Sequence, residues 1–293
     1  MIPLVILLAA MLWLACAVKV NAAAKKTFYV ITKAETHCAY SEGGTMDYKT
    51  KYTYYKTGLK KSEASPGKST WIYDKSGNIK EIRSGGGGKV IYKYTKKKGK
   101  ITKLKIYDNS EKKTTDVYTY KKGKVHKRVH YIDDEDADIS KQQITTYHSN
   151  GKPKKFTWGH LTFICDKNGY PTSRVSGNDY GYSESTTYEN TYDKKGRIKQ
   201  IIENTSIDDN GEKSNTSSVT TYTYKEKSGR VTKLTKTIVT TGADGSVWTD
   251  VITTKFSHKK IKIAKKYQKA VAKEIETIIT HANETAFDPL SYF

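Results

Sequence analysis

The sequence predicts an all-β protein, an antiparallel meander of many short hairpin strands in a curled or barrel-like sheet, followed by one C-terminal α-helix. Three observations support this. A motif of an aromatic residue, a polar turn ending in glycine and an aliphatic residue recurs along most of the chain. The segments between turns are rich in Tyr, Thr, Val and Ile and often alternate with a period of two, which is typical of half-buried strands. A helical apolar stripe appears only near the C-terminus.

The clearest copy of the motif spans residues 73–79, Tyr-Asp-Lys-Ser-Gly-Asn-Ile. A three-residue Lys-Ser-Gly loop requires a positive φ at Gly77, which glycine adopts without a Cβ clash. Asp74 would then accept hydrogen bonds from backbone amides two residues on, and Tyr73 and Ile79 would form a cross-strand pair. Strict and looser copies predict hairpin turns at Gly58, Gly77, Gly99, Gly123, Gly151, Gly169, Gly196 and Gly229.

Strand-like segments lie between these turns, and we expect about 14 to 18 strands from their number and spacing. A flat sheet of that size would accumulate too much twist, so we expect it to roll up. The predicted strands include residues 26–33, 47–56, 89–94, 100–107, 114–120, 124–132, 142–147, 155–165, 185–192, 197–205, 217–225, 230–240 and 247–256.

The two ends of such a meander should differ in charge and length. The glycine turns alternate with other connections, which must lie at the opposite edge of the sheet. The latter are longer and carry much of the acid, as in residues 133–140 and 207–215. Because long loops bind ligands more often than tight turns, we expect any binding loops at this opposite edge.

The C-terminal stripe predicts a helix from about residue 264 to about residue 282. Its apolar residues recur at i, i+4 spacing: Ile263, Tyr267, Val271, Ile275, Ile279 and Ala282. We expect it to pack on or inside the sheet, or to cap one end, because its mixed charge and narrow stripe favour packing over an interfacial membrane helix. The tail after it, residues 283–293, contains Pro289 and should be irregular.

The N-terminus indicates export. Residues 1–18 are apolar and Ala22, Ala23 and Ala24 precede Lys25, which fits a signal peptide over residues 1–24. An uncleaved membrane anchor and lipidation at Cys16 are the alternatives, and all three place the chain outside the cytoplasm, secreted or at the cell surface. We therefore divide the chain into residues 1–24, a repeat domain over residues 25–256, and a C-terminal helix and tail over residues 257–293.

Two cysteines remain after the leader, Cys38 and Cys165. In an oxidising compartment they either form a disulfide or stay as two separate half-buried thiols. Neither belongs to a zinc-type Cys/His cluster.

A formal net charge of +22 favours acidic partners, and the alternative is a solvated lysine-rich surface with no such partner. In an exported protein the expected partner is a polysaccharide or an anionic wall polymer. Nucleic acid is the less favoured partner, although Tyr-Lys strands such as residues 92–94 could stack bases. Membrane contact is expected only through the N-terminal segment.

No residue pattern predicts catalysis, a cofactor or a metal. The acidic run at residues 133–138 lacks the spacing of a calcium loop, and residues 84–89 lack the spacing of a phosphate-binding loop. No histidine lies in a recognisable motif with a nucleophile or an acid; the seven are His37, His126, His130, His148, His160, His258 and His281. We therefore expect no catalytic, cofactor or metal site and no enzyme activity.

The Tyr-Asp-x-x-Gly-x-Ile unit, strict at residues 73–79 and 192–198, resembles the YD (RHS-type) repeat of exported bacterial proteins. The resemblance covers roughly residues 50–240, and Pro153, Cys165 and Pro171 depart from it. It implies antiparallel sheets that curl into shells or barrels and serve as scaffold or encapsulating structure. It transfers no catalytic residue.

The expected function is an exported, cell-surface or wall-associated scaffold or binding module for carbohydrate or an acidic wall polymer. One alternative is an extracytoplasmic enzyme with a site on the long-loop edge. The other is a nucleic-acid-binding sheet. An outer-membrane barrel is disfavoured by the lysines scattered through the strands.

Overall fold

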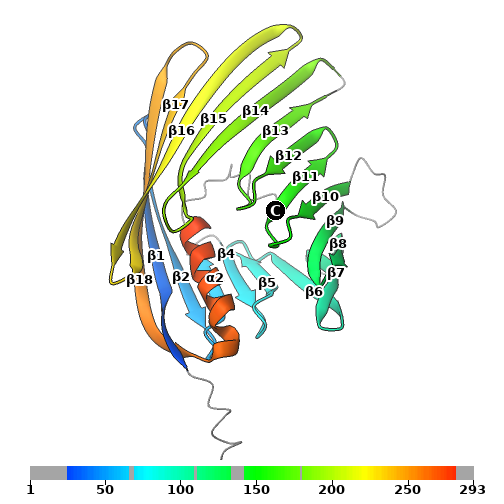
Figure 1. Cartoon of the computed structure of the whole chain (residues 1–293), viewed down its shortest axis with the longest axis vertical. Helices are drawn as coiled ribbons and strands as arrows, with labels where there is room; N and C mark the ends of the chain where they lie inside the picture. The colour runs from blue at the N-terminus through cyan, green and yellow to red at the C-terminus, as the bar shows by residue number, and fades with distance from the viewer. Residues whose placement is uncertain (1–24, 66–68, 109–110, 133–141, 179, 282–293) are drawn as a thin grey trace, which may run out of the picture.

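The structure is a computed structural model, and it describes residues 25–65, 69–108, 111–132, 142–178 and 180–281. Within these described residues, eighteen strands form one antiparallel sheet in which each strand pairs with its neighbours in the chain. The first strand pairs with both the second and the last, so the sheet closes into a barrel (Figure 1). The predicted all-β meander with one C-terminal helix is confirmed, and the strand number lies at the upper end of the expected range.

The first half of the barrel consists of β1 (Lys26–Ala39), β2 (Thr45–Tyr54), β3 (Lys60–Ser65), β4 (Ser69–Tyr73), β5 (Ile79–Ser84), β6 (Lys89–Lys97), β7 (Lys100–Asp108), β8 (Glu111–Lys121) and β9 (Lys124–Ile132). The second half consists of β10 (Gln142–Tyr147), β11 (Pro153–Trp158), β12 (Leu161–Cys165), β13 (Pro171–Gly177), β14 (Tyr182–Tyr192), β15 (Ile198–Asp209), β16 (Glu212–Lys227), β17 (Arg230–Thr241) and β18 (Val247–Ile263), followed by α2 (Lys265–His281). β18 continues past Phe256, where we expected the repeat domain to end.

All of the predicted glycine turns form hairpin tips, and each of these glycines has a positive φ, between 72° and 89°. Two kinds of turn occur. At Gly77 the three-residue loop is closed by Asp74 and Asn78, whose backbone N···O distance is 2.8 Å. At Gly99, Gly123 and Gly229 the residue before glycine also has a positive φ, near 50°, as two-residue hairpin turns require.

The aspartate of the motif closes the loop as predicted. Asp74 Oδ1 accepts the backbone amides of Ser76 (2.7 Å) and Asn78 (2.9 Å). Asp166 and Asp193 accept the equivalent amides in the turns at Gly169 and Gly196, over 2.8 to 3.1 Å. The register also pairs Tyr73 with Ile79. Local hydrogen bonding therefore explains the recurrence of the motif.

The opposite edge differs from the prediction. Where the structure describes its connections they are short, and β15 and β16 are joined by Asn210 and Gly211 alone, both with positive φ. The predicted strand at residues 155–165 is in fact the β11–β12 hairpin, which turns at Gly159 (φ 52°) and His160. Its turn lacks the aspartate and the polar run that identify the other tips, which is why the sequence pattern did not separate the two strands.

Tyrosine hydroxyls connect neighbouring hairpins near the glycine-turn end. In each case the motif tyrosine donates to the backbone carbonyl of the aliphatic residue that follows the preceding tip. The pairs are Tyr94 to Ile79 (2.6 Å), Tyr120 to Ile101 (2.6 Å) and Tyr224 to Ile198 (3.0 Å). Buried tyrosines thus satisfy their hydroxyls within the wall of the barrel.

The helix α2 lies inside the ring of strands (Figure 1). Ile278 packs with Ile31 and Leu234, and Val271 packs with Leu59 and Ile263. Lys60 joins β3 to α2, because its Nζ lies 2.9 Å from Glu63 Oε2 and 2.7 Å from Glu274 Oε1. The main apolar core therefore lies between α2 and the wall. Of the three expected positions for the helix (on the sheet, inside it, or capping one end), the structure shows the one inside the sheet.

Strand register shows which residues point into the barrel, since directly opposed residues share a face. Leu234, which packs on α2, stands opposite Tyr224 and Thr254. Followed strand by strand, this inner face carries Glu203, Tyr188, Arg174, Phe163, Phe156, Thr145, Arg128, Tyr118, Leu104 and Tyr94. The lumen is therefore lined by aromatic, hydroxyl and charged side chains.

The outer face is rich in lysine and threonine. One transverse row crosses five neighbouring strands and consists of Lys49, Glu35, Lys255, Lys233 and Lys225. Apolar exceptions include Ile164 and Val175, each nearly half exposed on β12 and β13. Among the described residues no helix has the length and apolarity needed to cross a membrane.

Candidate ligand cavity inside the barrel

A cavity of about 780 Å³ lies between α2 and the glycine-turn end of the barrel. Four hairpin tips border it, those at Gly151, Gly169, Gly196 and Gly229. Phe28 and Tyr29 of β1 border it as well. The tips belong to the second half of the chain, so residues far apart in sequence meet at one site.

The helix α2 forms one side of the cavity, and its position against the opposite part of the wall leaves the cavity space unfilled. Val271 and Ile278 are buried against the barrel wall. Ala272, Lys273 and Glu276 border the cavity from other positions on the same helix. Because one stripe of α2 is held by the wall near β1, β17 and β18, the helix does not fill the space beside the β10–β15 tips.

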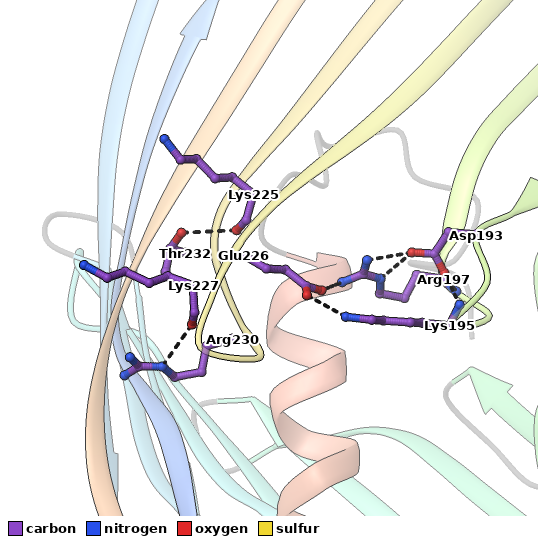
Figure 2. A network of polar contacts seen from close by, with 8 residues as sticks. All are labelled: Asp193, Lys195, Arg197, Lys225, Glu226, Lys227, Arg230 and Thr232. Atoms are coloured by element: carbon purple, nitrogen blue, oxygen red, sulfur yellow. Dashed lines mark hydrogen bonds and ion pairs between the residues drawn. The ribbon is translucent and has the colours of Figure 1, made fainter.

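An ion-pair network fixes two of the bordering tips relative to each other (Figure 2). Arg197, after the Gly196 turn, contacts Asp193 Oδ2 through Nε (2.7 Å) and Nη2 (2.6 Å). Its Nη1 lies 2.5 Å from Glu226 Oε1, and Lys195 Nζ lies 2.5 Å from Glu226 Oε2. The Arg197 guanidinium also stacks over the Tyr224 ring at 4.2 Å. The network joins the β14–β15 tip to the end of β16.

The β16–β17 hairpin has its own cross-strand bonds. Thr232 donates its hydroxyl to the Lys225 carbonyl (3.1 Å), and Arg230 Nε donates to the Lys227 carbonyl (3.4 Å). The guanidinium of Arg230 lies over the Tyr29 ring at 4.1 Å, which connects this tip to β1.

The charges of this network are stable at neutral pH. The hydrogen bond from Lys195, followed by that from Arg197, lowers the pKa of Glu226 despite partial burial. Burial alone would raise the pKa of Asp193, but hydrogen bonds from the Arg197 and Lys195 amides and the Arg197 side chain lower it overall. Burial, and then the charge of Arg230, lowers the pKa of His258, so this cavity-lining imidazole is neutral at pH 7.

A second charged cluster lies elsewhere on the inner face. Asp116 Oδ1 is 2.6 Å from His130 Nδ1 and 3.1 Å from Arg128 Nε, and Tyr118 donates its hydroxyl to Asp116 Oδ2 (3.3 Å). No sequence motif joins these residues, and the structure brings them together from neighbouring strands. A register shift between Thr119 and Tyr120 places Asp116 opposite His130. The regular register of the Gly123 turn would have placed Asp116 opposite Val129, so the sequence alone did not indicate this pair.

The other residues considered in the sequence take structural positions. Cys38 and Cys165 are both buried and unpaired, and burial raises the pKa of the Cys165 thiol to about 12. His37 pairs with Asp47 at 2.8 Å on exposed side chains, and His148 contacts the Cys165 carbonyl at 3.1 Å. The acidic run at residues 133–138, the leader with Cys16, Ala282 and the tail lie outside the described residues.

Within the described part of the chain, no three His, Cys, Asp or Glu side chains are grouped as a metal site would require. The residues that border the cavity are chiefly lysine, arginine, tyrosine and aliphatic side chains. What the geometry offers is therefore a partly apolar, positively charged chamber.

No family model matches the chain, and no curated protein matches its sequence. Similar solved structures include a porin-like protein from Bacteroides uniformis, with 11% identity, a TM-score of 0.36, and coverage of 78% of this chain and 98% of that one. A triple mutant of the Rhodopseudomonas blastica porin has 8% identity, a TM-score of 0.30, and coverage of 79% and 100%. A chain of the TcdB2-TccC3-Cdc42 structure has 11% identity, a TM-score of 0.25, and coverage of 69% and 15%. Structural similarity at these TM-scores is too low to support any inference about this protein. The evidence for a closed barrel is the pairing of β1 with both β2 and β18.

Closure of the barrel contradicts the function expected from sequence. A wall-binding scaffold needs tyrosines that a polymer can reach, but the tyrosine face is turned into the lumen. The alternatives fail as well. The long-loop edge consists of short turns where it is described. Tyr92 and Tyr94 point to the opposite face from Lys93, so they cannot form one nucleic-acid surface with it.

Proposed function

We propose that this chain is an extracytoplasmic β-barrel that binds a small molecule in its lumen. The observation that carries the proposal is the cavity between α2 and the four hairpin tips. Its volume of about 780 Å³ is in the usual range for small-molecule sites, which are concave, mostly apolar and supplied with a few fixed polar groups. Aromatic and aliphatic side chains would supply the contact area, and the Arg197 network would supply the fixed polar groups.

The location outside the cytoplasm rests on the N-terminal leader and is part of this proposal. So is kinship with the YD-repeat proteins, whose sheets enclose space. The proposal contains no catalytic step. In it, the barrel wall and α2 together form a container whose binding site lies at one end.

The site can be tested by filling it. N-phenyl-1-naphthylamine and 8-anilinonaphthalene-1-sulfonate fluoresce on transfer to apolar surroundings and share one aromatic skeleton. We expect at least one of them to bind residues 25–293 saturably with a stoichiometry of about one. Ala272 borders the cavity on α2, so Ala272→Trp should abolish the saturable signal.

Ala270 provides the matched control. It is an exposed alanine on the same helix but does not border the cavity, so Ala270→Trp should leave dye binding unchanged. Absence of saturable binding by both dyes, or equal loss in both variants, would overturn the proposed function.

A second candidate is a porin-type pore. It is favoured by the closed ring of eighteen strands around a polar lumen, since barrels of 16–18 strands enclose aqueous channels. It is opposed by the outward lysine row, because a lysine at the bilayer midplane costs about 2–4 kcal/mol. Conductance across a planar bilayer, or flotation with liposomes free of anionic lipid, would support the pore; protein that stays in the aqueous fraction would support the container.

A further inference from the structure

The cavity that forms the proposed binding site is strongly asymmetric in charge. Its border contains the basic residues Lys152, Lys167, Lys195, Arg197, Arg230 and Lys273. The acidic residues on the same border are Glu226 and Glu276. The six basic residues come from four hairpin tips and one helix.

Of the two acidic residues, Glu226 is committed to particular partners. Both oxygens of Glu226 are engaged, one by Arg197 and the other by Lys195. Asp193 holds the other edge of Arg197. These contacts neutralise Lys195 and Arg197 internally and hold them in place.

Three other lysines on the cavity border have no acidic partner of this kind. Lys152 and Lys167 extend from the Gly151 and Gly169 tips, and Lys273 extends from α2. Among the described residues none of the three forms an ion pair. All three are exposed, so they attract a counter-charge with the strength of charges in water.

Apolar surface lies within the same cavity. Phe28, Tyr170, Pro153 and Ile279 border it, and Tyr170 makes an edge-to-face contact with Tyr192 at 5.8 Å between ring centroids. A ligand that satisfies both features needs a flat apolar body and an anionic group.

We propose that the barrel selects an aromatic anion, a molecule with a ring system and one carboxylate, sulfonate or phosphate group. The inference rests on the proposed function, because it assigns the ligand class of the same cavity. The ring would lie among Phe28, Tyr170 and Ile279. The anionic group would lie toward Lys152, Lys167 and Lys273.

The two dyes test the charge requirement directly, since they differ by one sulfonate. We expect the sulfonate to bind at least tenfold more tightly than the neutral amine at low salt. Lys167→Gln and Lys273→Gln should each weaken sulfonate binding about fivefold, the effect of a unit charge about 4 Å away at the dielectric of water. Neither substitution should change binding of the neutral dye.

Lys75 is the matched control for Lys167, because both follow the aspartate of the same three-residue turn, and Lys75 does not border the cavity. Lys75→Gln should leave both dyes unaffected. Equal affinity of the two dyes, with binding still lost in Ala272→Trp, would overturn the anion selectivity and leave the proposed function standing. An equal effect of Lys75→Gln and Lys167→Gln would also overturn it, because only net charge would then be involved.

Discussion

At the scale of single residues, the fold depends on glycines that accept positive φ and on aspartates that close the loops beside them. Most hairpin glycines face open space, but Gly58 does not. A Cβ built on Gly58 would lie 2.7 Å from Ile263 Cδ1 and 3.2 Å from Val271 Cγ2, whereas one on Gly196 would have no neighbour within 4 Å. Gly58 is thus the point where the β2–β3 tip touches the end of β18 and Val271 of α2.

These two glycines give a paired prediction. Gly196→Ala should cost about 1–2 kcal/mol of unfolding free energy, the strain of a left-handed alanine. Gly58→Ala carries the same strain and also overpacks the junction with α2, which adds about 1–3 kcal/mol. Urea unfolding followed by circular dichroism measures both. Equal losses would show that the β2–β3 tip does not press on the helix.

Asp116 illustrates a buried charge that needs its partners. Its exposure is 2%. Burial alone would raise its pKa, but the hydrogen bond with His130 and the charges of Arg128 and His130 lower it overall. A carboxyl whose pKa is lower in the folded state than in the unfolded state stabilises the protein above its ordinary pKa of about 3.9, and the contribution disappears as the pH falls through the folded value.

Asp116→Asn should therefore destabilise the barrel at pH 7 by about 3–5 kcal/mol, because it leaves Arg128 without its buried counter-charge. The difference from the wild-type protein should shrink as the pH falls below about 4. Unfolding midpoints measured across that range test the sign. Asp47→Asn is the control, since the His37–Asp47 pair is exposed, and it should have little effect at any pH.

At the scale of elements, α2 occupies part of the space inside the barrel and forms one side of the cavity that remains. Its stripe at i, i+4 spacing identified Val271 and Ile275 as inward-facing, and Val271 is indeed buried. The stripe omitted Ile278, which is 4% exposed. Because the wall curves around the helix, a broader face is covered than the narrow stripe predicts.

This arrangement predicts a difference between two adjacent isoleucines. Ile278→Ala should cost about 2–5 kcal/mol, the usual range for emptying a packed core position. Ile279 is half-buried and borders the cavity, so Ile279→Ala should cost clearly less. The comparison requires only urea unfolding curves. If the ranking is reversed, α2 is rotated relative to the wall.

At the scale of the whole molecule, charge is the dominant property. The net charge of +22 is concentrated partly in the outward row, where Lys255, Lys233 and Lys225 stand opposite one another on adjacent strands. Like charges directly opposed across strands destabilise a sheet, and a large net charge opposes compactness.

We therefore expect the urea midpoint to rise as NaCl increases from about 0.05 M to about 0.5 M, since the Debye length falls over that range. Lys233→Glu should stabilise the barrel at low salt by roughly 0.5–1 kcal/mol and reduce the salt dependence. Lys75→Glu changes the net charge equally but lies away from the row, and it should do less. A midpoint independent of salt would contradict repulsion within the row.

Local residue patterns were enough to predict the hairpin tips, the antiparallel meander and the C-terminal helix. These depend on short-range chemistry: a glycine that accepts positive φ, an aspartate that bonds amides two and four residues on, and apolar spacing. The β11–β12 turn, which lacks that chemistry, was missed for the same reason. The pairing of β1 with β18, the inward direction of the tyrosine face and the cavity between four tips and α2 became visible only in the folded chain. Closure depends on twist and register summed over all the strands, so no local pattern contains it. For that reason Tyr92 and Tyr94, which the sequence analysis considered as a stacking surface for bases, point into the lumen instead.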